Sequence, residues 1–136
     1  MARHSDPGGF LVLVVSAETT IRKTRTLLME AAGYRVVAVE SRHKAIQIAQ
    51  QFDFDIAILD HTLDKHDRIR CVRFIRQAAP ATRIVVLHKS GADCGADLYL
   101  DSREGPERLV SCVKTLLASK TKEKVEAANT AGLEPI

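Results

Sequence analysis

Asp60 stands at a position where a carboxylate could do chemistry. It follows the short apolar run 56–59, which is typical of a strand buried on both faces. A carboxylate at such a strand end is a natural acceptor for a phosphoryl group. An acceptor of this kind needs acidic neighbours that help to hold Mg²⁺, which prefers oxygen ligands. The first apolar run, residues 11–15, is followed instead by Ser16, Ala17 and Glu18.

Length and composition indicate one domain with one core. The chain has 136 residues, and 46% of them are hydrophobic, so a core can form without disulfide support. The three cysteines are Cys71, Cys94 and Cys112, and no two of them form a CxxC pair. We interpret them as reduced thiols, which are typical of a cytoplasmic protein, and this spacing argues against a structural zinc site.

Several functional classes find little support in the sequence. No apolar run approaches the ~20 residues that cross a bilayer, and residues 1–9, a polar lead-in expected to be flexible, lack the apolar part of a signal peptide. The net charge is only +3, and 4% of the residues are aromatic. These values argue against nucleic-acid binding through Arg70, Arg73, Arg76 and the lysine-rich segment 114–124.

The elements that would position Asp60 alternate along the chain. Strands are expected over residues 10–15, 34–39, 55–60, 83–88 and 98–100. Helices are expected from Thr19 or Thr20 to Ala32, over 44–51 behind a Ser41 cap, from Asp67 to about Pro80, and from Pro106 to about 118. This alternation favours a parallel sheet with helices on both faces, and sites in such sheets lie beyond the carboxyl ends of the strands.

The chain resembles the receiver domain of bacterial response regulators over about residues 10–118. The resemblance rests on four motifs, in order: Val14-Val15-x-x-Glu18-x-x-Ile21-Arg22, Gly33-Tyr34-x-Val36-Val37, Asp55-x-x-Ile58-Leu59-Asp60 and Gly95-Ala96-Asp97-x-Tyr99-Leu100. It implies a flavodoxin-like fold, an α/β doubly wound five-stranded parallel sheet of order 2-1-3-4-5. Residues 119–136 are then expected to extend the last helix and end in a frayed tail.

The resemblance also implies a role for single positions. In the family, a histidine kinase phosphorylates the aspartate that matches Asp60, and the aromatic switch position matches Tyr99. The two acidic positions that bind magnesium are Ser16 and Ala17 here, the Thr/Ser position is His88, and the lysine position is Ser102. Asp67 matches the acid of the loop, whereas Arg68 and Asp64 replace the usual Gly and Pro.

These replacements predict a vestigial pocket, formed by Ser16, Ala17, Glu18, Thr62, His88 and Ser102 around Asp60. Glu18, Asp60 and the Thr62 carbonyl could hold at most a weakly bound ion, so no metal or other cofactor is expected. Losing one group that stabilises the developing charge typically costs about 10²–10³ in rate. Lys89 or Arg103 could replace the missing lysine, although solvated surface charges are the favoured interpretation.

The histidines near this pocket have two interpretations. His88 could bind a metal or a phosphate opposite Asp60, or it could be a strand-end histidine hydrogen-bonded to Asp60 or to the backbone, which we favour. His61 and His66 flank the same loop, so a transition-metal site of His and Asp is conceivable. Their spacing does not form a metal-binding motif.

A second departure from the family is a missing helix. Only residues 89–94 separate His88 from the motif that begins at Gly95, and a parallel crossover usually takes about a dozen residues. The fourth helix of the family is therefore expected to be absent or reduced to a turn. Its loss would bare apolar surface, to be covered by a protein partner, a second copy of the chain or a collapsed loop. Phe74, expected to point away from the core beside Arg70 and Arg73, is a candidate for this interface.

These features favour a module that is not an enzyme. The leading hypothesis is an atypical receiver in signal transduction that works without phosphorylation and acts by protein–protein interaction. The alternative is a working receiver that a histidine kinase phosphorylates on Asp60, assisted by Lys89 or Arg103.

Overall fold

The computed structural model describes residues 9–88 and 95–132, with side chains as far as Lys120. Its strands are β1 (Leu11–Val15), β2 (Arg35–Val39), β3 (Ile56–Leu59), β4 (Arg83–Leu87) and β5 (Leu98–Leu100). Its helices are α1 (Thr19–Ala31), α2 (Arg42–Ala49), α3 (Lys65–Ala78) and α4 (Pro106–Gly132). All strand pairs are parallel and the order is β2-β1-β3-β4-β5, so the predicted topology is confirmed.

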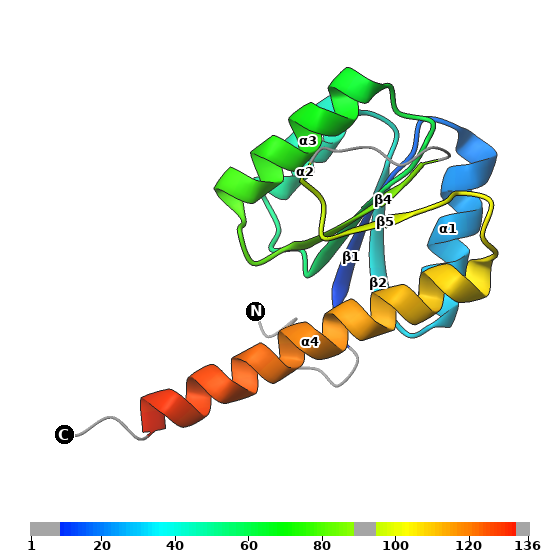
Figure 1. Ribbon diagram of the computed structural model, residues 1–136. Coiled ribbons are helices and arrows are strands. Elements are labelled where there is room, and N and C mark those ends of the chain that lie inside the picture. Colours follow the sequence, from blue (N-terminus) through cyan, green and yellow to red (C-terminus); the bar gives the residue numbers. More distant parts are fainter. Residues whose placement is uncertain (1–8, 89–94, 133–136) are drawn as a thin grey trace.

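Helices cover both faces of the sheet, α1 and α4 on one side and α2 and α3 on the other (Figure 1). Alternate residues of each central strand enter different cores. In β1, Leu13 and Val15 belong to the core beneath α2 and α3, whereas Val12 and Val14 belong to the core on the opposite face. Since both faces are covered, both sets must be apolar, and the strand reads as a continuous hydrophobic run.

The capping residues differ in part from those expected. Ser41 caps α2 as predicted, and its hydroxyl accepts from the Lys44 backbone amide. Glu18 caps α1 in place of a threonine, and Asp64 caps α3 in place of Asp67. A carboxylate just before a helix accepts from exposed backbone amides and also favours the positive end of the helix dipole. The last helix continues to Gly132, and residues 133–136 lie outside the described residues.

The described residues form no helix between β4 and β5, which is consistent with the predicted reduction of the fourth helix; residues 89–94, on which that prediction falls, lie outside the described residues. Residues 95–97 are tied to α3 through Arg76. Its Nε and Nη2 donate to the Gly95 carbonyl at 3.1 and 2.9 Å, and Nη2 pairs with Asp97 at 2.9 Å. Asp97 also accepts from the Ile84 amide at 2.7 Å. These contacts fix the segment that leads into β5 against α3 and β4.

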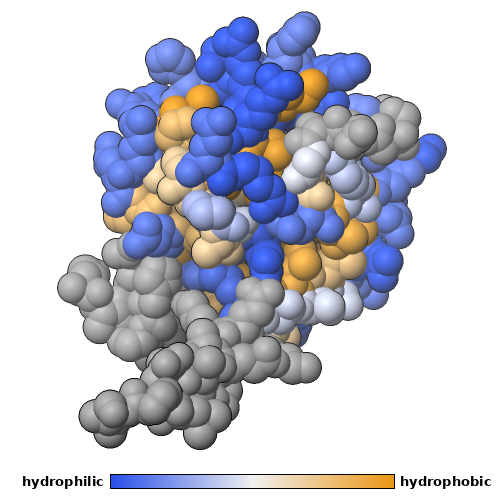
Figure 2. All heavy atoms as spheres, turned by 60° about the vertical axis from the view of Figure 1, so that its left-hand side comes forward, coloured by the Kyte–Doolittle hydropathy of each residue, from blue (hydrophilic) through white to orange (hydrophobic). Residues whose placement is uncertain are grey.

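Phe74 does not point away from the core, and that prediction was wrong. Its side chain is half-buried and packs against the core beneath α2 and α3, as do Ala96 and Tyr99. Phe74 lies three residues after the buried Cys71, so it flanks the buried stripe of α3 one turn further along. Arg70 and Arg73 are exposed as expected. Figure 2, which brings the left-hand side of Figure 1 forward, shows apolar patches in a largely hydrophilic surface.

Replacing Arg76 with leucine should loosen β5. The guanidinium joins α3 to Gly95 and Asp97 with its planar fork, but both charged side chains are partly exposed. We expect a loss of about 1–2 kcal/mol in the free energy of unfolding. Urea unfolding measures this loss, and amide exchange in β5 locates it. Arg76→Lys keeps the charge without the fork and should be intermediate. An unchanged midpoint for Arg76→Leu would contradict the role of this contact.

Candidate functional site

The carboxyl ends of β1 and β3 bring several predicted residues together. Ser16 and Asp60 directly follow these neighbouring strands, and both are fully buried, Asp60 being 1% exposed. The Asp60 amide still donates to the Val15 carbonyl, so the carboxylate is fixed to the sheet. Thr62 lies beside them, because its hydroxyl accepts from the Ala17 amide at 2.7 Å. The structure thus brings three of the residues predicted for the vestigial pocket, Ser16, Ala17 and Thr62, together with Asp60.

The Asp60 carboxylate is hydrogen-bonded on both oxygens. Oδ1 accepts from the Thr62 amide at 2.9 Å and from the Thr62 hydroxyl. Oδ2 accepts from Nε of Arg25 at 3.3 Å, and the two side chains form an ion pair that is 15% and 1% exposed. The cation nearest to Asp60 in the described part of the chain therefore comes from α1.

Arg25 is the functional residue that the sequence analysis missed. It lies four residues after Ile21 and three before Leu28, so it interrupts the apolar stripe of α1. An arginine inside such a stripe needs a partner, because a buried charge without one is costly. That interruption was the available signal, but the motifs of the resemblance gave no role to a cation on this helix.

The positions proposed for a replacement cation lie elsewhere. Arg103 binds Asp101 through Nε and Nη2, the latter at 2.6 Å, and this bond and the charge of Asp101 raise the pKa of Arg103. Lys89 lies outside the described residues. Ser102 and Arg25 both line a pocket of about 180 Å³ between α1 and the loop that follows β5.

The oxygen donors of the site do not fit a magnesium ion. Glu18 uses both carboxylate oxygens to cap α1, accepting from the Thr20 and Ile21 amides at 3.2 and 2.8 Å. Ala17 offers no side-chain ligand, and Ser16 offers only a hydroxyl. Asp60 is already bound to a cation, and Mg²⁺ is usually held by carboxylates. Over residues 9–88 and 95–132, no group of three His, Cys, Asp or Glu side chains could hold a metal ion.

His88 lies at the end of β4, where its amide donates to the Leu100 carbonyl at 2.9 Å. Burial, followed by the positive charges of Arg68 and His61, lowers the pKa of the His88 imidazole. Arg68, in the first turns of α3, is only 4% exposed, and its Nη1 donates to the Leu63 carbonyl at 2.8 Å. A group of basic side chains therefore meets beside β3 and β4.

The remaining positions taken from the resemblance have partners of their own. The Tyr99 hydroxyl accepts from the Gly95 and Ala96 amides at 2.9 and 3.2 Å. Asp67 pairs with Arg42 of α2 at 2.9 Å. These contacts tie Tyr99 to the segment that returns to β5, and they join α2 to α3.

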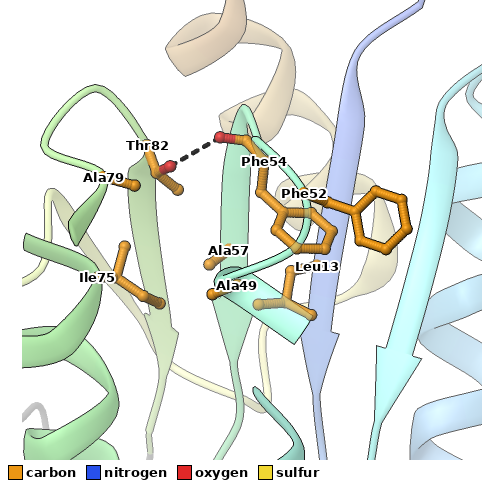
Figure 3. Close-up of a pocket in the computed structure, with 8 residues that line it drawn as sticks. All are labelled: Leu13, Ala49, Phe52, Phe54, Ala57, Ile75, Ala79 and Thr82. Atoms are coloured by element: carbon orange, nitrogen blue, oxygen red, sulfur yellow. Dashed lines mark hydrogen bonds between the residues drawn. The ribbon is translucent and has the colours of Figure 1, made fainter. Parts of the chain in front are cut away.

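A small void lies at the opposite end of the sheet (Figure 3). Its volume of about 10 Å³ holds one water at most. The Thr82 hydroxyl donates to the Phe54 carbonyl at 2.7 Å across its mouth, where β3 and β4 begin. The lining is Leu13, Ala49, Phe52, Phe54, Ala57, Ile75, Ala79 and Thr82. This void is a packing defect of the core and not a ligand site.

The sequence matches the family model of the response regulator receiver domain over residues 12–114. The chain belongs to this family. It is 28% identical over 127 residues to the transcriptional regulatory protein ResD of Bacillus subtilis, covering 88% of the chain and 52% of ResD. It is 25% identical over 114 residues to the aerobic respiration control protein ArcA of Escherichia coli, covering 79% and 48%. The chain spans about half the length of the curated relatives it matches.

Solved receiver structures share the fold. The chemotaxis response regulator CheY4 of Vibrio cholerae has a TM-score of 0.71 at 23% identity, covering 79% of this chain and 98% of that one. A CheY-like receiver protein from Methanospirillum hungatei has a TM-score of 0.77 at 19% identity, covering 84% and 98%. The family and fold predicted from the sequence are thus confirmed. In the described part of the chain, no helix combines the length and apolarity that a bilayer crossing requires.

Proposed function

We propose that this receiver domain signals without phosphorylation of Asp60 and acts by contact with a protein partner. The observation that carries the proposal is the ion pair between Arg25 and Asp60. The acceptor carboxylate of a receiver must be free to attack phosphorus. Here one oxygen binds the guanidinium and the other accepts two hydrogen bonds from Thr62.

Electrostatics support the same conclusion. Phosphoryl transfer is driven mostly by positioning and by stabilisation of negative charge. A phosphoryl group on Asp60 would add charge at a buried position, and the residues that follow β1 beside it are a serine and an alanine. Arg25 matches the single charge of the carboxylate, so the unmodified state is already balanced.

The solvent-facing side of α3 suits an acidic protein partner. His66, Arg70, Arg73 and Gln77 are exposed and follow one another along α3 at helical spacing. Arg76 attaches the returning segment 95–97 to the same helix. A homodimer with this stripe at its two-fold axis would bring like charges together, which is costly. A heterologous partner with carboxylates therefore fits this face better than a second copy.

Phosphate-mimic binding tests the proposal. The protein is titrated with beryllofluoride and Mg²⁺, and incorporation of label from radioactive acetyl phosphate is measured, with Asp60→Asn as the matched control. We expect no saturable binding and equal background label in both proteins. Micromolar binding, or label that Asp60→Asn abolishes, would overturn the proposal and establish the working phospho-acceptor.

A further inference from the structure

Arg68 is a buried cation without an anion. It is 4% exposed, and within the described ranges no carboxylate pairs with it. Nη1 donates to the Leu63 carbonyl, but Nε is buried and has no hydrogen-bond partner among the residues that the structure describes. Buried charges are normally paired and hydrogen-bonded, because removing them from water is expensive. The nearby Asp60 does not compensate Arg68, since its carboxylate binds Arg25.

His61, which follows β3, contributes a second buried side-chain nitrogen to this region. Nδ1 of His61 is buried and also has no hydrogen-bond partner in the described part of the chain. His61 follows β3 and His88 follows β4, and these strands are paired in register, with Leu59 opposite Val86. Because the two strands are parallel neighbours, both histidines lie at the same edge of the sheet, beyond the carboxyl ends of β3 and β4. Burial is the main cause of the lowered pKa of His88, and the smaller contributions of Arg68 and His61 agree with this arrangement.

We propose that Arg68, His61 and His88 form a binding site for a phosphate group, separate from the carboxylate of Asp60. Three basic side chains come from three elements, α3 and the ends of β3 and β4. A tetrahedral oxyanion has oxygens that can accept from several directions, and a guanidinium binds such oxygens well. The ligand would supply the negative charge and the acceptor that Arg68 lacks. Free phosphate and the phosphate of a small metabolite share this chemistry.

The site is tested with inorganic phosphate as the probe. The Nε–Hε signal of Arg68 and the ring signals of His61 are followed by NMR in the full chain. We expect saturable shifts and a melting temperature that rises with phosphate concentration, because a ligand of the folded state stabilises it. Chloride at matched ionic strength controls for screening. Adenosine monophosphate and glycerol phosphate distinguish a metabolite phosphate, which would bind at least tenfold more tightly than inorganic phosphate.

Three substitutions test the site. Arg68→Gln should abolish the phosphate-dependent shifts of His61 and the thermal stabilisation, whereas Arg73→Gln, on the exposed side of the same helix, should keep both. Arg68→Met removes the buried charge, so without phosphate it should be at least as stable as the native protein. No shift at Arg68 or His61 in high phosphate, or equal stabilisation of Arg68→Gln, would overturn the site. A strongly destabilised Arg68→Met would assign Arg68 a purely structural role. None of these results depends on whether Asp60 can be phosphorylated.

Discussion

Replacing Lys120 with methionine is expected to lower the free energy of unfolding by about 3–5 kcal/mol. Lys120 is 7% exposed and Asp55 is 2% exposed, and Nζ lies 3.5 Å from the Asp55 carboxylate. The ammonium also donates to the Ala81 carbonyl at 2.9 Å. Methionine would keep most of the apolar volume but leave a buried carboxylate without its cation.

This loss of stability is large because the Asp55 carboxylate cannot rotate into solvent. Its Oδ2 accepts from the Leu11 amide at 2.9 Å, which fixes the carboxylate where β1 begins. Chemical denaturation of the single variants and of Lys120→Met/Asp55→Asn forms a double-mutant cycle. The double variant should recover part of the loss, because a neutral amide is less costly to bury than a charge.

Lys114→Met is the matched control, since Lys114 is exposed on the same helix. Its effect should stay within about 0.5 kcal/mol. If Lys120→Met were no more harmful than Lys114→Met, Lys120 would not join α4 to the sheet. The expected difference would show that this segment of α4 is part of the domain and not a loose extension.

Lys120 also shows what could not be predicted from the sequence. It stands in a lysine-rich stretch that was interpreted as the start of a helix extension, and lysine is rarely buried. Its partner is 65 residues away. A pair of this kind forms only when the fold brings α4 across the beginning of β3, so no local pattern marks it. Arg25 and Asp60, 35 residues apart, escaped prediction for the same reason.

The sheet, in contrast, was predictable because its signals are local. Strands covered on both faces must be apolar at every position, and they alternate with helices that have one buried stripe. The positions of Asp60 and Ser16 follow from this order, since parallel strands end at one edge. The cap of α3 was misplaced because Asp64 and Asp67 both precede apolar helical residues, and side-chain type alone cannot choose between them.

Phe74 illustrates an intermediate case. The helical spacing correctly placed Val72 and Ile75 in the core, and Arg70 and Arg73 outside it. The width of the buried stripe depends on what packs beside the helix. Phe74 lies on the same side of α3 as Asp67, which pairs with Arg42 of α2, and its side chain packs against the core beneath these two helices.

Replacing Arg25 with methionine is expected to cost about 3 kcal/mol, near the lower end of the range for breaking a buried ion pair. Asp60 would remain 1% exposed in the native fold, and of the described residues Thr62 alone would still donate hydrogen bonds to its carboxylate. The two hydrogen bonds from Thr62 limit the loss. Thermal and urea unfolding measure it, and Arg25→Met/Asp60→Asn should restore most of the stability because no charge is then left unpaired.

The same variant separates two causes of an inactive acceptor. If Arg25 alone blocked Asp60, Arg25→Met would take up label from acetyl phosphate. We expect it to remain unlabelled, because Ser16 and Ala17 still supply no carboxylate and Glu18 still caps α1. Arg22→Met, one turn away and bound to the Ser16 carbonyl instead of a carboxylate, is the control and should cost much less. If Arg25→Met takes up label and the added Asp60→Asn substitution removes it, Arg25 blocks an acceptor site that is otherwise competent. If Arg25→Met is unlabelled and as stable as the native protein, the ion pair contributes little to stability.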